Sequence, residues 1–177
     1  MRFVLLGLTL AAMLVSPAFA HPDPGHADSL ASGALHPLSG VDHVFVMASV
    51  GLWGALVGGC AIWAWPATFI ATMLAGFAAA RLGLQISFVE SAISASIMVV
   101  GLLAALRVKA QLSLGAAIVG LFAFFHGHAH GTEVAASVIP YAAGFTLSTA
   151  VLHSAGVGLG LCMRRLLQGM TRVEALR

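Results

Sequence analysis

Residues 112–130 read LSLGAAIVGLFAFFHGHAH, a stretch that contains no Asp, Glu, Lys or Arg. Its length suits a helix that crosses the ~30 Å hydrocarbon core of a bilayer. Lipid cannot satisfy backbone N–H and C=O groups, and no alternating pattern of a membrane β-barrel is visible. The stretch therefore predicts a membrane-spanning helix, and its histidines predict chemistry at one end of that helix.

The rest of the chain has the same apolar character. Of the 177 residues, 60% are hydrophobic and 8% are charged, and the mean hydropathy is +1.01. Soluble domains carry roughly a quarter charged residues, which cover their surface. This composition argues against a soluble enzyme and a disordered tail. Eight Lys and Arg against six Asp and Glu leave no basic patch for nucleic acid, so the expected partner is the lipid bilayer.

The N-terminus, residues 1–20, has the pattern of a secretory signal peptide. Arg2 precedes an apolar run at 3–15, and residues 18–20 (Ala-Phe-Ala) form an A-x-A cleavage pattern. The apolar run is short for a spanning helix, although an uncleaved first membrane helix is the alternative. We expect cleavage to leave His21 on the outer side of the cytoplasmic membrane.

The mature chain is expected to be an all-α bundle of five to six spans. An exposed periplasmic segment at 21–35, not helical through residue 32, precedes a transmembrane bundle at 36–167 and a basic tail at 168–177. The spans are expected at about 38–59, 62–80, 87–106, 112–130 and 134–153, with a further apolar stretch at 155–167. Pro140 and the glycines after it could break the last region into two helices, so the number of spans stays open.

The distribution of basic residues predicts the orientation. Arg107 and Lys109 follow the third span and fall on the inner side, as the positive-inside rule requires. Arg81 falls on the outer side, against the rule. The segment 126–133 then returns to the outer side, where the other polar motifs of the chain also lie.

The first of these motifs is HPLSGVDH, residues 36–43. Pro37 suits the first turn of a helix, and on a regular helix His36 and His43 would share a face, with Asp42 offset by one residue. An Asp–His pair in an apolar segment is costly unless it has a function. The alternative is a helix cap with an interfacial histidine, which explains Asp42 and His43 poorly.

The second motif is FHGHAHGTE, residues 125–133. His126, His130 and Glu133 follow one another at i, i+4 and i+7, so they form one stripe of a helix, whereas His128 points elsewhere. Imidazoles suit zinc, copper, iron and nickel, and a carboxylate adds an anionic ligand. The motif thus predicts a metal site, and the alternative is a belt of interfacial histidines.

Two further groups of acids and histidines are candidates. Glu90 lies near the outer start of the third span, where it either contributes to an ion site or stabilises the N-terminus of its helix. His21, Asp23 and His26 lie in the exposed segment, where they either capture metal weakly or are simply solvated. Histidines and acids from three spans could converge on one vestibule open to the periplasm.

Several other residues have mainly structural interpretations. His153 is expected to be a core histidine that bonds to a neighbour, with the inner step of an ion path as the alternative. Cys60 and Cys162 are expected to be buried and unreactive. The tryptophans are expected to anchor the inner interface, and the methionines to fill space: Trp53, Trp63, Trp65, Met47, Met73 and Met98.

Together the two motifs resemble the signatures of the HupE/UreJ family of hydrogenase and urease accessory membrane proteins. The resemblance covers nearly all of the mature chain and implies a bacterial nickel permease. It implies metal-handling roles for His36, Asp42, His43, His130 and Glu133, with His126 and His128 as helpers. The choice of nickel comes from the resemblance, because the ligand types alone allow zinc or cobalt equally.

We therefore expect a permease that brings Ni²⁺ into the cytoplasm for hydrogenase or urease metallocentre assembly. Nickel would be the transported substrate, and no permanent cofactor is expected. Cytoplasmic nickel-accepting accessory proteins would be the partners. The chain has no phosphate-binding GxxxxGK[ST] loop, so it would be a facilitator or secondary transporter.

Other functions remain open. The chain could be a membrane-bound metal sensor or storage protein, or an importer of cobalt or zinc. An intramembrane metallohydrolase is disfavoured because the HExxH motif is absent. A haem-binding electron-transfer subunit would need two facing histidines, and His43 with His126 could supply them.

Overall fold

A computed structural model describes residues 29–134 and 137–174, with side chains as far as residue 168. This part of the chain is all helical, as predicted, and contains no strand. Its helices are α2 (Leu30–Ser39), α3 (Val41–Val57), α4 (Ala61–Arg81), α5 (Val89–Ala105), α6 (Leu112–Glu133) and α7 (Val138–Glu174). The predicted signal peptide and His21, Asp23 and His26 lie outside the described residues.

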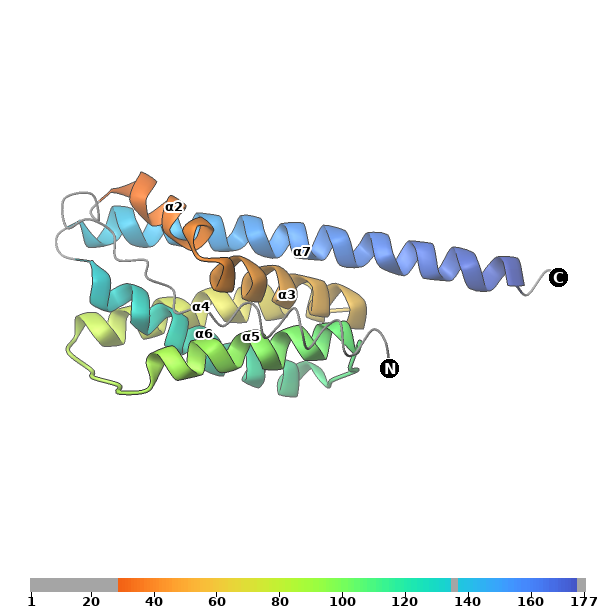
Figure 1. Cartoon of the computed structure of the whole chain (residues 1–177), viewed down its shortest axis with the longest axis horizontal. Coiled ribbons are helices and arrows are strands. Elements are labelled where there is room, and N and C mark those ends of the chain that lie inside the picture. Colours follow the sequence, from red (N-terminus) through yellow and green to blue (C-terminus); the bar gives the residue numbers. More distant parts are fainter. Residues whose placement is uncertain (1–28, 135–136, 175–177) are drawn as a thin grey trace.

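The helices form one bundle of the kind that spans a membrane (Figure 1). In the part of the chain described, α4, α6 and α7 are each long and apolar enough to cross a bilayer. Together α2 and α3 pass the same test as a broken span, whereas α5 is a shorter apolar helix. The structure thus contains three clear candidate spans, or four with the broken pair, and the five to six spans remain a prediction.

The first span departs from the straight helix that we expected at 38–59. Helix α2 already begins at Leu30, where Ser29 and Ser32 form a capping box with bonds of 3.0 and 2.9 Å. The chain then bends by 86° between α2 and α3, at Gly40. Pro37 consequently lies near the end of a helix rather than in its first turn, and residues 30–32 are helical rather than irregular.

The last helix is also longer than expected. Residues 138–174 form one continuous helix, so of the two arrangements that the sequence left open, the break into two helices does not occur. Pro140 lies in the first turn, where its missing N–H has no intrahelical partner to lose. At 1.5 Å per residue, this helix is about 55 Å long. Its C-terminal part therefore extends well past the other helices (Figure 1).

Close approaches at glycine hold the helices together. A Cβ on Gly127 of α6 would overlap the carbonyl oxygen of Met73 on α4, and one on Gly76 would overlap that of Phe124. Gly156 of α7 approaches the backbone of α3 at Ala48 in the same way. Small residues allow such contacts between backbones, which is how helices associate in lipid. The packing confirms the expected compact bundle.

The bundle core ends in a tryptophan pair. Trp53 and Trp65 are fully buried with ring centres 4.3 Å apart, so they are not the interface anchors that we expected. Their indole N–H groups donate to the carbonyl oxygens of Val108 (2.8 Å) and Leu112 (3.0 Å). We call this part of the molecule the tryptophan end. Trp63 is exposed, which suits an anchor.

The methionines and cysteines lie only in part where the sequence predicts. Met47 and Met73 lie in the core as predicted, whereas Met98 is exposed. Cys60 and Cys162 are both exposed free thiols, so the expectation that they are buried is wrong.

Candidate metal centre

The bend at Gly40 brings two histidines of the first motif against the second motif. His36 lies in the last turn of α2, and His43 lies in the first turn of α3. Both reach His130 of α6, and one ring nitrogen of each residue lies within 4.8 Å of the others. We call His36, His43 and His130 the three-histidine cluster. The cluster arises from three helices, two of which meet at a bend, and not from one helix face.

The rings of the cluster contact one another directly. The ring centre of His130 lies 4.8 Å from that of His36 and 5.2 Å from that of His43, and the centres of His36 and His43 are 5.8 Å apart. On its other side, His130 stacks on Phe145 of α7 at 4.8 Å with an interplanar angle of 14°. This stacking fixes the plane of the imidazole from behind.

The cluster leaves buried nitrogen atoms without hydrogen bonds. His130 is 0% exposed, and neither of its ring nitrogens has a hydrogen-bond partner among the described residues. Nε2 of His43 is likewise buried and has no hydrogen-bond partner among the described residues. Buried polar groups are nearly always paired, and leaving one unpaired costs about 1–3 kcal/mol. Unpaired imidazole nitrogens that converge on one point are suited to hold a cation.

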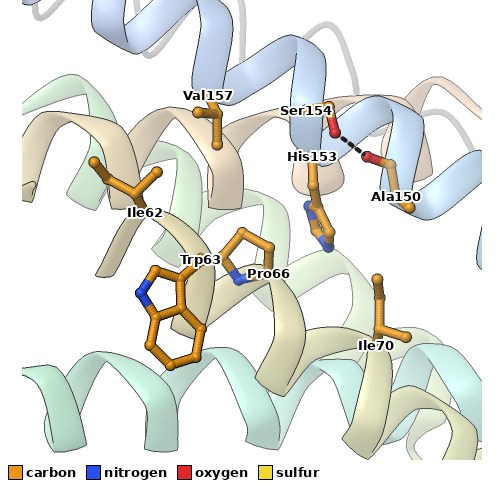
Figure 2. Close-up of a pocket in the computed structure, with 8 residues that line it drawn as sticks. All are labelled: Ile62, Trp63, Pro66, Ile70, Ala150, His153, Ser154 and Val157. Atoms are coloured by element: carbon orange, nitrogen blue, oxygen red, sulfur yellow. Dashed lines mark hydrogen bonds between the residues drawn. The ribbon is translucent and has the colours of Figure 1, made fainter. Parts of the chain in front are cut away.

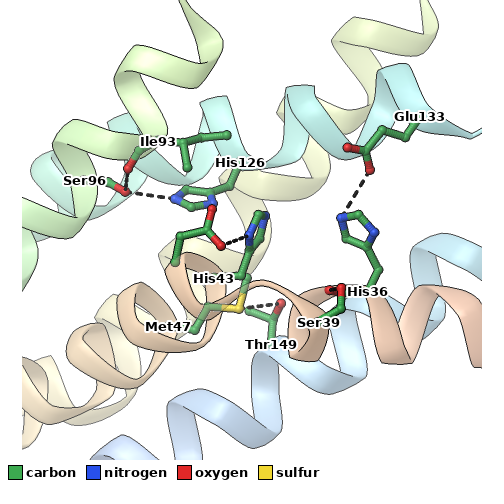
Figure 3. A network of polar contacts seen from close by, with 10 residues as sticks. His36, Ser39, His43, Met47, Ile93, Ser96, His126, Glu133 and Thr149 are labelled. Atoms are coloured by element: carbon green, nitrogen blue, oxygen red, sulfur yellow. Dashed lines mark hydrogen bonds and ion pairs between the residues drawn. The ribbon is translucent and has the colours of Figure 1, made fainter. Parts of the chain in front are cut away.

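Two carboxylates lie beside the cluster, and Figure 3 shows one of them, Glu133, facing His36. Asp42 Oδ1 is 3.2 Å from His43 Nδ1, and Glu133 Oε2 is 3.2 Å from His36 Nε2. The first contact orients the His43 ring so that Nε2 faces the cluster, as carboxylates commonly do for metal-ligating histidines. The Glu133 side chain is 35% exposed, so it lies between the cluster and the surroundings of the bundle.

His126 is the fourth histidine at this place. Its ring centre lies 5.2 Å from that of His43, and its Nε2 lies 3.0 Å from Ser96 Oγ of α5 (Figure 3). Because Ser96 donates its one hydroxyl proton to the Ile93 carbonyl oxygen, His126 must donate to Ser96. We therefore assign the proton of His126 to Nε2, which leaves its Nδ1 lone pair available.

Not every predicted residue reaches the cluster. His128 is buried on another side of α6, where its Nε2 lies 2.7 Å from the carbonyl oxygen of Leu84. It thus holds the connection between α4 and α5, as its offset from the helix stripe suggested. Glu90 is exposed in the first turn of α5 and is not one of the residues that make up the cluster.

The glycines of both motifs have a spatial role. Gly127 and Gly131 lie on the face of α6 that packs against α4, next to the histidine stripe, and a Cβ on Gly131 would lie 2.6 Å from the Phe77 carbonyl oxygen. A Cβ on Gly40 would lie 2.5 Å from Asp42 Oδ1 and 3.0 Å from His43 Nδ1. The alternation of His and Gly thus sets both the ligands and their distance from the neighbouring helix.

Some contributors to the site carry no clear signal in the amino-acid sequence. Ser96 is a small residue in an apolar span, yet its hydroxyl fixes the ring of His126. Tyr141, the one tyrosine of the chain, is buried with its ring centre 6.1 Å from that of His36. Arg81 donates to the Val134 carbonyl oxygen (2.6 Å) at the end of α6. That bond gives a structural reason for an arginine that runs against the positive-inside rule.

These features define a helical membrane protein with a candidate metal centre rich in imidazole. The family described as HupE / UreJ protein matches residues 8–176. The "Protein HupE" of Rhizobium leguminosarum bv. viciae is 39% identical over 162 residues, which are 90% of this chain and 84% of that protein. The chain belongs to the HupE/UreJ family, so the resemblance is confirmed. No solved structure matches it.

Family membership gives a general functional class. HupE/UreJ proteins are transporters and accessory proteins rather than enzymes, and they are associated with hydrogenase and urease and with nickel or cobalt transport. Both motifs that carry the resemblance contribute to the three-histidine cluster.

Proposed function

We propose that this protein imports Ni²⁺ across the cytoplasmic membrane for hydrogenase or urease metallocentre assembly. The observation that carries the proposal is the three-histidine cluster, which lies where a candidate span is broken and leaves buried imidazole nitrogens unpaired. Irregular backbone at membrane depth is tolerated where it lines an ion site, and broken helices are common in transporters.

The donor set supports a transition metal as the cargo. His36, His43 and His130 offer imidazole nitrogens, and His126 Nδ1 is a fourth donor beside them. Mg²⁺ and Ca²⁺ prefer oxygen ligands, so these donors select against the most abundant divalent cations. Imidazole alone does not distinguish nickel from cobalt or zinc, and the preference for nickel rests on the family.

The carboxylates would offset the charge of the ion. Asp42 and Glu133 lie at the cluster, where the low dielectric makes an uncompensated divalent charge costly. Glu90 is exposed at the same end of the bundle and would raise the local concentration of cations. The ligands of the cluster are neutral imidazoles, with the carboxylates beside them. Such a site would bind the ion and also release it, as a transporter requires.

The charges of the two ends support inward transport. Arg107 and Lys109 lie in the connection at the tryptophan end, and Arg164 donates to the Ala55 carbonyl oxygen at the end of α3 (3.0 Å). By the positive-inside rule, this end faces the cytoplasm and the three-histidine cluster faces the periplasm. The segment with His21, Asp23 and His26 would then capture metal outside.

Two alternatives are weaker on geometric or sequence grounds. A haem-binding subunit would need a porphyrin between His43 and His126. These rings touch edge to face with centres 5.2 Å apart, so a porphyrin does not fit between them. A metallohydrolase would need a general base arranged as in HExxH, which the chain lacks. A sensor or storage protein would bind metal without moving it, and transport measurements separate that role from import.

The decisive experiment is ⁶³Ni²⁺ accumulation in cells that lack other nickel importers. We expect accumulation with this protein, its loss in His130→Leu, and normal uptake in Thr132→Ala, an exposed control on the same helix. Nickel should compete better than cobalt or zinc. If zinc or cobalt competes better, the proposal of an importer stands, but its transported metal is not nickel. Binding without accumulation would favour a sensor or storage role.

A further inference from the structure

A second group of metal-binding atoms lies deeper in the bundle than the three-histidine cluster. Thr149 of α7 donates its hydroxyl proton toward Met47 Sδ of α3 (3.4 Å) and Met73 Sδ of α4 (3.8 Å). All three residues are 0% exposed. Figure 3 shows Met47 and Thr149 directly below His43. Two sulfur atoms, one from α3 and one from α4, therefore lie around one hydroxyl oxygen from α7.

Packing alone explains this arrangement poorly. A thioether sulfur is a weak hydrogen-bond acceptor, and the two sulfurs are the partners that the described residues give to the Thr149 hydroxyl. A buried hydroxyl without a good acceptor destabilises the fold, and a valine of the same shape would avoid that cost. The hydroxyl is therefore better explained by what it can bind than by how it packs.

We propose that Met47, Met73 and Thr149 form a second, inner binding site for the transported cation. The proposal rests on the proposed function for the identity of its cargo. When the O–H bond of Thr149 rotates away from the sulfurs, the hydroxyl oxygen and both thioether sulfurs would be free to serve as ligands. Thioethers bind soft and borderline metals, whereas Mg²⁺ and Ca²⁺ demand oxygen ligands, so the site would repeat the selection made at the cluster.

The inner site is continuous with the cluster. Met47 follows His43 by one helical turn, a rise of about 6 Å along α3. The same ion could therefore leave imidazole nitrogen and reach sulfur in one short step. Because all three inner ligands are uncharged, they would hold a divalent ion weakly, and weak binding is what a transit site requires.

His153 extends the line of donors one turn further along α7 from Thr149. Its Nδ1 lies 2.7 Å from the Met47 carbonyl oxygen, which confirms the predicted bonded core histidine. Its Nε2 is buried and has no hydrogen-bond partner in the part of the chain described. The ring lines a cavity of about 360 Å³ between α4 and α7, beside Pro66 and Ile70 (Figure 2). An ion released by the sulfurs would meet this nitrogen next.

Nickel K-edge X-ray absorption tests the inner site directly. The sample is the purified full-length protein with Cys60→Ser and Cys162→Ser, because both thiols are exposed and would bind nickel themselves. After loading with Ni²⁺ alone beyond one equivalent, we expect sulfur scattering from the metal. The scattering should vanish in Met47→Leu/Met73→Leu, which keeps side-chain volume. It should persist in Met98→Leu, an exposed methionine on α5.

Uptake of ⁶³Ni²⁺ into proteoliposomes gives a second readout of the same variants. The double variant should bind nickel at the cluster within about twofold of the parent, yet import it about tenfold more slowly or worse, the scale on which groups around a metal site act. The Met98→Leu control should import normally. Normal import by the double variant would overturn the inner site.

The two proposals fail in different ways. Absence of sulfur scattering in the parent protein overturns the inner site even if nickel is imported. Sulfur scattering in a parent protein that does not import nickel supports the inner site and overturns the proposed function. Loss of all nickel binding in a folded double variant would mean that the methionines belong to the cluster, which overturns a separate inner site.

Discussion

The two ends of the bundle treat buried ring nitrogens in opposite ways. At the tryptophan end, the indole N–H groups of Trp53 and Trp65 each donate to a backbone carbonyl oxygen. At the end that holds the three-histidine cluster, His130 is equally buried, yet neither of its nitrogens has a partner among the described residues. Both ends are packed around aromatic rings, so packing does not explain the difference.

The difference separates a part of the molecule built for stability from a part built for binding. Paired N–H groups contribute to stability and hold the connection between α5 and α6 in place. Unpaired nitrogens cost stability, and proteins retain them mainly at functional sites. The cost is tolerated at the cluster because a cation can satisfy several nitrogens at once. Substitutions at the two ends should therefore affect different measurements.

The largest effect is expected for His130→Leu. Removing this ligand should reduce ⁶³Ni²⁺ uptake about 100-fold or more, the upper end of the effects seen around metal sites. The melting temperature in detergent should stay the same or rise, because a buried unpaired imidazole is replaced by a side chain that needs no partner. A strong fall in melting temperature would show that His130 serves the fold rather than an ion.

Asp42→Asn should have the next largest effect on transport. The carboxylate orients His43 at 3.2 Å, and loss of such a partner lowers metal affinity or activity about tenfold or more. Uptake at limiting nickel measures it, with protein level in the membrane as the control. Uptake equal to that of the parent protein would remove Asp42 from the site.

Trp65→Phe tests the tryptophan end. The change leaves an aromatic ring but removes the N–H that donates to Leu112, so the free energy of unfolding should fall by about 1 kcal/mol. Nickel binding at the far end should not change. Denaturation in mixed micelles measures the free energy of unfolding, and equilibrium dialysis measures nickel binding. Trp63→Phe is the matched control, because Trp63 is exposed.

The smallest effect is expected for Glu90→Gln. The exposed carboxylate in the first turn of α5 attracts cations over a distance but is not one of the residues that form the cluster. Uptake at limiting nickel should fall about threefold at low ionic strength and recover at high salt, where charges beyond about one Debye length are screened. A loss that persists at high salt would make Glu90 a ligand, as the sequence alone allowed.

The second motif was the more predictable half of the site. The spacing of His126 and His130 places both on one stripe of α6, and the structure buries both rings on the core side. The separate orientation of His128 was predicted for the same reason. Helical periodicity decides these directions locally, so a single sequence suffices for them.

The first motif was harder to interpret from the sequence. A regular helix would place His36 and His43 on one face, whereas the chain bends by 86° between them. The capping pair Ser29 and Ser32 is a local sequence signal for the early start of α2. The bend itself depends on how α2 packs on α7, where a Cβ on Gly33 would overlap the Tyr141 carbonyl oxygen. Such contacts join residues far apart in the sequence.

The sequence by itself determined that the chain is helical and surrounded by lipid, which side-chain types can bind metal, and the family. Apolar runs, helical periodicity and side-chain types are local properties, so one sequence suffices for them. Only the tertiary structure decided which ligands meet. His36, His43 and His130 come together because α6 packs closely on α4 at Gly127 and the chain bends at Gly40. The tertiary structure also placed Thr149 between two sulfurs. Helix crossings of this kind depend on backbone contacts between distant segments, which no local pattern records.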